Sequence, residues 1–192
     1  DGNRITAFYD VRDRLVKLVH SSGQFMDFVY DENDRIIQVI ESTGRRATFS
    51  YDPTGEHLIA VTDARGHTTR YTYFTEGPAA HFLASVDFPD GTHLYFTYDE
   101  RGRLTGLSRG GGAERLLFAY DSAGAVTVTN ALGASTKLYF DQNGIALRVM
   151  DPLGRVIQTL VDENMRITQL SDGAGYVYTY KYDEDGNLVE IT

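Results

Sequence analysis

An aromatic residue followed by aspartate recurs along the chain every 20 to 25 residues, and this recurrence constrains the fold more than any other feature. The pair stands at Tyr9-Asp10, Tyr30-Asp31, Tyr51-Asp52, Tyr98-Asp99, Tyr120-Asp121, Phe140-Asp141 and Tyr182-Asp183. Val161-Asp162 and Tyr73-Phe74 occupy the places of two further copies. A fixed period of this length is typical of repeat architectures, in which each copy packs on its neighbours. We therefore predict one repeat array over residues 1–192 with about nine copies.

Each copy carries a turn signature directly after the aromatic residue. The pattern Asp-x-x-Gly spans Asp52–Gly55, Asp99–Gly102, Asp121–Gly124, Asp141–Gly144 and Asp183–Gly186. It is typical of type I turns, because aspartate accepts nearby backbone N–H bonds and glycine adopts a left-handed backbone. In the first two copies Asp13 and Asp34 replace the glycine, and aspartate also tolerates that backbone. Gly102→Val is expected to cost about 1–2 kcal/mol, more than Gly111→Val in a looser segment.

A second turn of the same chemistry lies near the middle of each repeat, as in Asp63–Gly66 and Asn130–Gly133. The segments between turns are strand-sized, and their apolar residues alternate, as Leu94, Phe96 and Tyr98 do. Two strands per repeat, joined by four-residue turns, predict an all-β antiparallel meander. Its sixteen or so strands exceed the roughly ten that a twisted open sheet usually reaches without curling, so we expect the sheet to curl or spiral.

Three segments leave the strand prediction less simple. The second strand of many copies has apolar residues three apart, as at Leu15 and Leu18, which requires either two partly covered faces or a β-bulge. Residues 113–120 alone resemble a helix, but their phase in the repeat favours a strand. Residues 74–88 break the spacing and are expected to form an irregular copy with an insertion, as a protruding loop or corner.

Charge and composition exclude several function classes. The formal net charge is −9 and no basic stripe is present, so a nucleic-acid surface is not expected. There are no cysteines, hence no disulfide and no thiolate site. No apolar run is long enough for a membrane span.

No motif in the chain predicts catalysis. His20, His57, His67, His81 and His93 show no metal-ligand spacing and are expected at the surface or on a strand face. The Asp-x-x-Gly turns lack the ligand set of a calcium loop, and residues 108–112 lack the Lys-Ser/Thr of a phosphate loop. We therefore predict no catalytic, cofactor-binding or metal-binding residue, no cofactor and no enzymatic activity. The assigned residues are the structural repeat signature: Tyr9, Asp10, Tyr30, Asp31, Tyr51, Asp52, Gly55, Tyr98, Asp99, Gly102, Tyr120, Asp121, Gly124, Asp141, Gly144, Tyr182, Asp183 and Gly186.

Residues 97–107 (TYDERGRLTGL) and residues 62–73 (TDARGHTTRYTY) resemble the YD repeat of the Rhs family, and the resemblance extends over essentially the whole chain. That family includes bacterial Rhs polymorphic toxins, the B/C components of insecticidal toxin complexes, wall-associated proteins and teneurins. The resemblance implies a β-sheet strip that spirals into a hollow shell. In the bacterial toxins such a shell encloses a C-terminal toxin, which an aspartate autoprotease at the end of the core releases.

The self-cleavage motif of that family, Asp-Pro-x-Gly-Leu, is similar to Asp151-Pro152-Leu153-Gly154-Arg155. The arginine departs from the motif, and in-phase repeats continue beyond it, so we interpret this segment as an ordinary turn. Clipping near Gly154 in the purified protein would contradict that interpretation.

The resemblance implies a structural shell segment of a longer, secreted or cell-surface bacterial protein, which encapsulates and helps deliver a C-terminal toxin or effector. Its expected partners are neighbouring repeats and an enclosed cargo. The alternative is an adhesion or carbohydrate-binding YD-repeat protein, because tyrosines on exposed faces can stack on sugars. Packing between the strands is the simpler explanation of the tyrosines.

Overall fold

The computed structural model describes residues 2–112 and 114–192, and within them the chain forms 18 strands and one short 3-10 segment. The elements are β1 (Ile5–Tyr9), β2 (Leu15–His20), β3 (Phe25–Tyr30), β4 (Ile36–Glu41), β5 (Arg46–Tyr51), β6 (Leu58–Thr62), β7 (Thr68–Tyr73), β8 (Leu83–Asp87), β9 (His93–Tyr98), β10 (Leu104–Arg109), η1 (Gly110–Gly112), β11 (Leu116–Tyr120), β12 (Val126–Thr129), β13 (Ser135–Phe140), β14 (Ala146–Met150), β15 (Val156–Val161), β16 (Ile167–Ser171), β17 (Val177–Tyr182) and β18 (Leu188–Ile191). The predicted all-β class is confirmed, with slightly more strands than expected.

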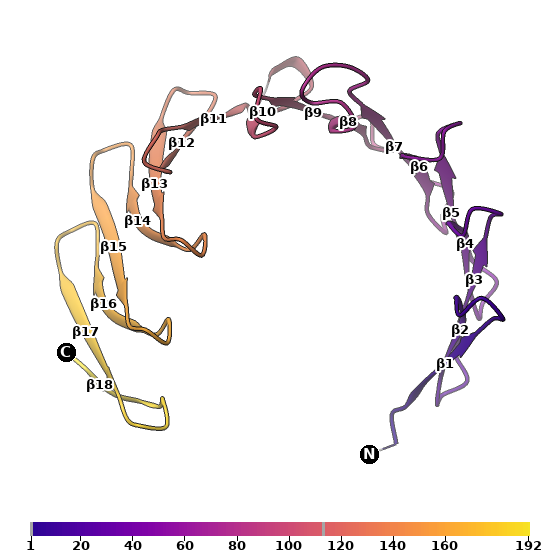
Figure 1. The fold of residues 1–192 in the computed structure, drawn as a ribbon, viewed down its shortest axis with the longest axis horizontal. Helices are drawn as coiled ribbons and strands as arrows, with labels where there is room; N and C mark the ends of the chain where they lie inside the picture. Colours follow the sequence, from indigo (N-terminus) through magenta and orange to yellow (C-terminus); the bar gives the residue numbers. More distant parts are fainter. Residues whose placement is uncertain (1, 113) are drawn as a thin grey trace. The chain divides into compact units, whose positions relative to one another are not determined.

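The strands divide between two compact units. The first comprises the residues through Phe96 together with Glu100–Gly102, and the second comprises Thr97–Asp99 together with the residues from Arg103 onward. In the first unit each strand from β1 to β8 pairs antiparallel with the next, so the chain runs as a meander (Figure 1). The order of strands therefore follows the order of the sequence.

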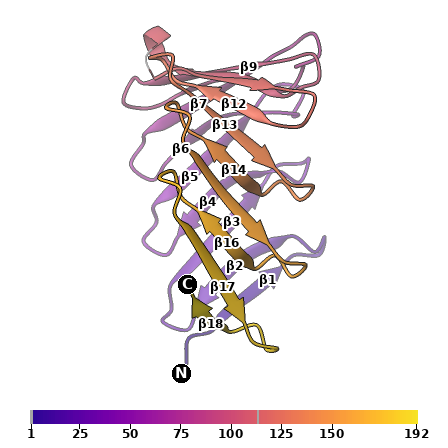
Figure 2. The ribbon, with the colours of Figure 1, turned by 90° about the vertical axis from the view of Figure 1, so that its left-hand side faces the viewer.

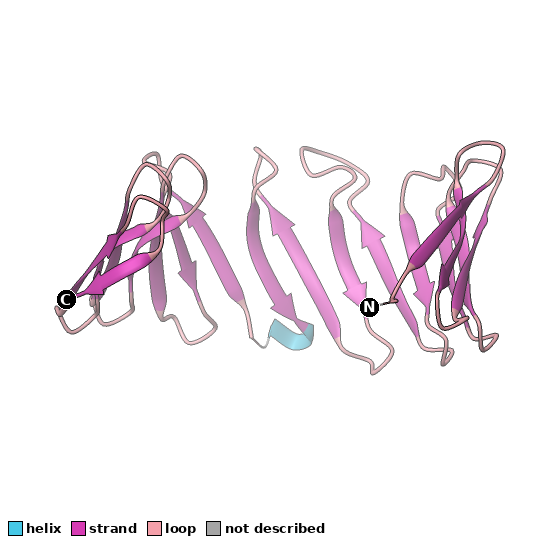
Figure 3. Ribbon diagram, turned by 90° about the horizontal axis from the view of Figure 1, so that it is seen from below, coloured by secondary structure: helices cyan, strands magenta, loops and turns pink. Residues whose placement is uncertain are grey.

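The second unit repeats the same arrangement. Each strand from β10 to β17 pairs antiparallel with its successor, and β13 to β18 lie side by side in Figure 2. The segment η1, cyan in Figure 3, interrupts the connection between β10 and β11. No helical segment within the described residues has the length and apolar character that a membrane crossing requires.

The Asp-x-x-Gly sequences form the predicted turns. In the turn that begins at Asp141, the Gly144 N–H donates to the Asp141 carbonyl over 3.1 Å. The Asp141 carboxylate accepts the N–H groups of Asn143 and Ile145 at 2.9 and 2.8 Å. Gly144 has φ +79°, and Asp13 and Asp34 have φ +59° and +63° where they replace glycine. The turn prediction is therefore confirmed for both versions of the motif.

A β-bulge in the second strand of the repeat explains the apolar residues spaced by three. Tyr9 pairs with Leu15 while Ala7 pairs with Leu18, so the register shifts between them. Tyr9 and Ala7 are two residues apart and share a face, which places Leu15 and Leu18 on that face as well. The same shift accompanies Tyr30, Tyr51, Tyr73, Phe140, Val161 and Tyr182. Of the two explanations left open by the sequence, the bulge is the one observed.

The sheet of each unit is a single layer with little buried volume. Among the described residues, the buried ones are Ser85, Val86, Gly106 and Ala125, and no large side chain is fully enclosed. In β3, Phe28 and Tyr30 are half-buried while Val29 between them is exposed. Packing is thus limited to contacts between neighbouring strands, and in β2 and β4 the residues of both faces are half-buried by them.

Two sequence expectations need correction. The irregular stretch is shorter than residues 74–88, because Leu83 pairs with Tyr73 and opens the regular strand β8. Gly111 also has φ +75°, the same as Gly102, so backbone conformation does not distinguish these two glycines. The helix-like segment 113–120 contains strand β11 as its phase predicts, and Ala113 lies outside the described residues.

Met165 occupies the turn position that glycine holds elsewhere, with φ +62°. A side chain in left-handed backbone costs about 1–2 kcal/mol, and glycine does not carry this cost. Met165→Gly should therefore stabilise the chain by about 1 kcal/mol, read as a higher urea midpoint. The reverse substitution Gly133→Met, at φ +81° with open space around its Cβ, should lower the midpoint. Equal midpoints for Met165→Gly and wild type would contradict the strain assigned to this turn.

Candidate functional site: the repeated aspartate–arginine–tyrosine trio

Three side chains meet in the same way in four repeats, and we call this group the aspartate–arginine–tyrosine trio. The members are the turn aspartate, the arginine four residues later and the tyrosine that ends the next repeat. The four examples are Asp10, Arg14 and Tyr30; Asp31, Arg35 and Tyr51; Asp99, Arg103 and Tyr120; and Asp162, Arg166 and Tyr182. The trio is therefore the repeating contact that links one copy to the next.

The arginine connects the other two members. Arg35 donates from Nε to the Asp31 carboxylate at 2.7 Å, and its Nη2 lies 2.7 Å from the same oxygen. Its guanidinium carbon stands 4.7 Å from the centre of the Tyr51 ring, within the range of a cation–π contact. The corresponding distance is 4.3 Å for Arg103 over Tyr120. One planar cation thus binds a carboxylate through its edge and an aromatic ring through its face.

The tyrosine hydroxyl adds a hydrogen bond to the preceding repeat. Tyr51 donates to the Ile36 carbonyl over 2.9 Å, and Ile36 directly follows Arg35. The same bond joins Tyr30 to Leu15, Tyr73 to Leu58, Tyr120 to Leu104 and Tyr182 to Ile167, over 2.7 to 2.9 Å. This bond explains why tyrosine, with a buried ring and a polar tip, suits the position better than phenylalanine.

The pKa values of three trio aspartates, Asp10, Asp31 and Asp162, are lowered by their hydrogen bonds. For Asp10 the largest cause is the side-chain hydrogen bond from Arg14, and for Asp31 it is the backbone N–H of Arg35. For Asp162 the backbone N–H of Arg166 comes first, followed among the favourable contacts by the Arg166 side chain. The carboxylates are therefore ionised at neutral pH. Their oxygens already accept hydrogen bonds from N–H groups of the same turn. This leaves the turns poorly suited to calcium, which needs about six to eight free oxygen ligands.

The lowered pKa values predict a specific loss of stability in acid. A carboxyl group whose folded pKa lies below its unfolded pKa stabilises the fold above the unfolded value, and this contribution disappears as pH falls through the folded value. Stability should therefore be flat above about pH 5 and fall from about pH 4 downward. The measurement is the urea midpoint as a function of pH. Asp31→Asn should weaken the pH dependence, and an unchanged profile in that variant would contradict the role given to the carboxylate.

The repeat that begins at Asp52 carries an insertion and has a histidine in place of the trio arginine. Asp52 begins its turn, but Glu56 is an extra residue, and His57 takes the place of the arginine. The His57 ring lies 4.3 Å from the Tyr73 ring between centroids, and its Nδ1 lies 2.9 Å from the Asp52 carboxylate. The hydrogen bond from His57 is the largest cause of the lowered pKa of Asp52. His57 thus keeps both contacts that arginine makes elsewhere.

The structure also brings His81 to His57, which the spacing of 24 residues gave no reason to expect. Nδ1 of His81 lies 3.1 Å from Nε2 of His57 and 3.5 Å from a carboxylate oxygen of Glu56. His57 has a side-chain exposure of 16% and is therefore half-buried, whereas His81 is 65% exposed and lies at the surface as the sequence predicts. His20, His67 and His93 instead pair with Ser22, Asp63 and Asp87.

Sequence reasoning named the tyrosines and aspartates of the signature and missed the arginines. The signal was present, because Arg14, Arg35, Arg103, Arg155 and Arg166 all stand four residues after a turn aspartate. The segment that resembles the self-cleavage motif forms such a turn: Gly154 donates to the Asp151 carbonyl over 3.0 Å, and Arg155 binds the Asp151 carboxylate at 2.6 Å. Its geometry matches that of the other turns.

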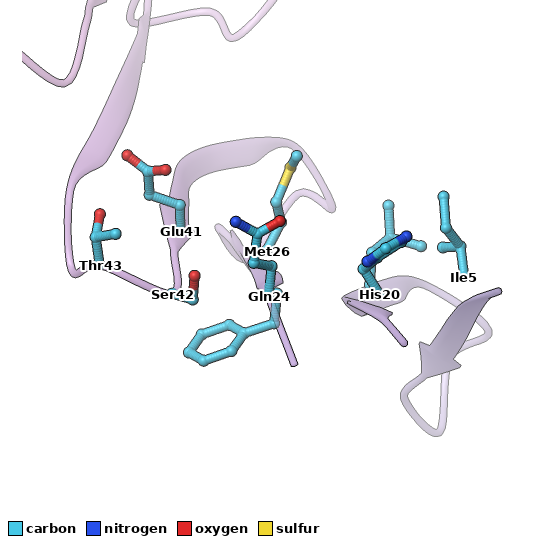
Figure 4. Close-up of a pocket in the computed structure, with 9 residues that line it drawn as sticks. Ile5, His20, Gln24, Met26, Glu41, Ser42 and Thr43 are labelled. Atoms are coloured by element: carbon cyan, nitrogen blue, oxygen red, sulfur yellow. The ribbon is translucent and has the colours of Figure 1, made fainter. Parts of the chain in front are cut away.

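A separate pocket of about 330 Å³ lies over β1 to β4, and apolar atoms form most of its surface. Figure 4 shows Ile5 and His20 at one end of it and Glu41, Ser42 and Thr43 at the other. The Glu41 carboxylate forms an ion pair with Arg45, and the His20 ring bonds to Ser22 at 2.7 Å. The two titratable groups are therefore engaged locally and do not form a joint site.

Comparison with known proteins identifies the repeat. The family model described as Teneurin YD-shell matches residues 1–192, whereas no curated protein matches the chain. Among solved structures, the Photorhabdus luminescens Tc holotoxin pore is similar at a TM-score of 0.59 and 11% identity, over 97% of this chain and 13% of that one. A crystal structure of TcdB2-TccC3-TEV has a TM-score of 0.47 and 12% identity, over 97% of this chain and 16% of that one. The chain thus spans a small fraction of the structures that it resembles.

Proposed function

The chain belongs to the Teneurin YD-shell family, and we propose that it is a non-enzymatic section of the wall of a hollow shell, which encloses a C-terminal toxin or effector and helps deliver it. The proposal places the chain in a longer, secreted or cell-surface bacterial protein. Its partners are the neighbouring repeats and the enclosed cargo.

The observation that carries this proposal is the single-layer construction of both units. A globular domain buries a core between layers, whereas here only four described residues are buried. The trio joins adjacent repeats at four places along the chain, as a wall requires, and the aspartates of these four turns are occupied by structural contacts. The similar fold in the Tc holotoxin pore is consistent with this role.

Protease protection of the cargo tests the proposal. The full-length protein containing this chain should be digested with trypsin, with its C-terminal segment expressed alone as the control. We expect the segment to resist cleavage within the full-length protein and to become sensitive when urea opens the repeats. Cleavage at the rate of the isolated segment would contradict encapsulation.

Adhesion through carbohydrate is the second candidate, favoured by the exposure of Tyr176 and Tyr178 at 67% and 40%. Exposed aromatic rings of this kind can stack on sugar faces. A glycan array distinguishes the candidates: a defined sugar ligand that is lost in Tyr178→Ala supports adhesion. If no sugar on the array binds, the result supports the structural role in a shell wall over adhesion.

A further inference from the structure

The histidine that replaces the trio arginine meets a second histidine and a glutamate beside the loop between β7 and β8. The loop closes on itself, since the Phe74 N–H donates to the Phe82 carbonyl over 2.9 Å and the His81 N–H donates to the Phe74 carbonyl over 2.8 Å. This brings His81 to the Asp52 turn, where Glu56 and His57 follow. A hollow of about 410 Å³ adjoins them, lined also by Tyr71 and Thr75.

We propose that Glu56, His57 and His81 bind a divalent transition metal of the zinc class, and we call these three residues the His57–His81 cluster. One potential ligand atom from each of these three residues lies within 4.8 Å of those from the other two. Two nitrogen and one oxygen ligands suit Zn²⁺, with a fourth tetrahedral position left for water.

The distances fit a common metal ion. Two ligand atoms bound to zinc at tetrahedral angles lie about 3.3 Å apart. The separation from Nε2 of His57 to Nδ1 of His81 is 3.1 Å, and that from Nδ1 of His81 to the Glu56 oxygen is 3.5 Å. The two imidazole rings are nearly parallel, at 15°, with centroids 5.0 Å apart, so the rings meet through their nitrogen-bearing edges.

Asp52 orients the first ligand. An ionised carboxylate only accepts hydrogen bonds, so the His57 nitrogen 2.9 Å from it, Nδ1, carries the proton. Nε2 is then left with its lone pair, and Nε2 is the nitrogen that faces His81. A carboxylate bound to the far nitrogen of a histidine ligand is the usual second contact in zinc sites.

The backbone of His81 adds an independent observation. His81 has φ +70°, in the left-handed region that few side chains adopt at no cost. Strained backbone of this kind collects at functional positions, and here it directs the imidazole toward His57. In the repeats with an intact trio, an arginine occupies the position of His57. The Asp52 repeat therefore has a pair of imidazoles where the other repeats have a permanently charged guanidinium.

Zinc titration of the intact chain by calorimetry tests the proposal. We expect one zinc ion bound per chain and a higher melting temperature, while Mg²⁺ and Ca²⁺ give neither effect, because imidazole ligands favour the zinc class. The key variant is His81→Asn, since asparagine tolerates the left-handed backbone and His81 is 65% exposed. It should bind zinc at least about tenfold more weakly, and Asp52→Asn about 10- to 100-fold more weakly.

His67→Asn is the matched control. His67 bonds to the carboxylate of Asp63 as His57 bonds to that of Asp52, but its sole described partner is that carboxylate. Zinc affinity should be unchanged in His67→Asn, and the metal-free melting temperature of His81→Asn should equal that of wild type. Undetectable zinc binding to wild type, or equal affinity in wild type and His81→Asn, would overturn the proposal.

Discussion

Gly102→Val is expected to destabilise the chain by about 3 kcal/mol, well beyond the cost of a left-handed turn alone. Gly102 has φ +75°, which accounts for about 1–2 kcal/mol. A Cβ at this position would also lie 2.7 Å from Cε2 and 2.9 Å from Cζ of the Phe82 ring. Overpacking against a ring adds about 1–3 kcal/mol.

Gly124 provides the control for this prediction. It holds the same turn position at φ +84°, but nothing lies within 4 Å of the point that a Cβ would occupy there. Gly124→Val should therefore cost only about 1–2 kcal/mol. Urea denaturation of both variants measures the difference. Equal losses would show that the contact with Phe82 does not limit this position.

Tyr51→Ala should have the second largest effect, a loss of about 2–3 kcal/mol. The half-buried ring packs under Arg35 at 4.7 Å, and the hydroxyl donates to the Ile36 carbonyl over 2.9 Å. Removing the hydroxyl alone in Tyr51→Phe should cost about 1 kcal/mol, since the ring and its cation–π contact remain. Stability should therefore increase from Tyr51→Ala to Tyr51→Phe to wild type. The two steps measure the contribution of the ring and that of the hydrogen bond separately.

Tyr95→Ala is the comparison for the tyrosine series. Tyr95 lies on the opposite face of β9 from Phe96 and is 46% exposed. Its removal should cost less than about 1 kcal/mol, because exposed side chains contribute little burial. If Tyr95→Ala and Tyr51→Ala lowered the urea midpoint equally, the trio would not be the contact that holds adjacent repeats together.

Much of the fold follows from local chemistry and could be predicted. The Asp-x-x-Gly turns depend on the turn residues themselves, so the sequence predicts Asp141–Gly144 and its equivalents directly. The bulge between Leu15 and Leu18 is indicated by the three-residue spacing of these two leucines. A strand with both faces partly buried would explain the same spacing. Met165 at φ +62° was not predictable, because methionine has no preference for that backbone.

The contacts between distant residues could not be predicted in the same way. His57 and His81 meet only because the loop of residues 74–82 folds back on the Asp52 turn. The longer interval between repeats around this loop identifies the copy as irregular. It does not indicate which residues the loop contacts when it folds back. Phe82 reaches Gly102 through the same loop, and no local pattern encodes that contact.

Electron cryo-microscopy of the full-length protein tests the shell assignment most directly. We predict a continuous single-layer wall that contains residues 1–192 and surrounds an internal volume occupied by the C-terminal segment. A map in which these strands are covered by a second layer of protein, or in which the C-terminal segment lies outside the wall, would contradict the assignment.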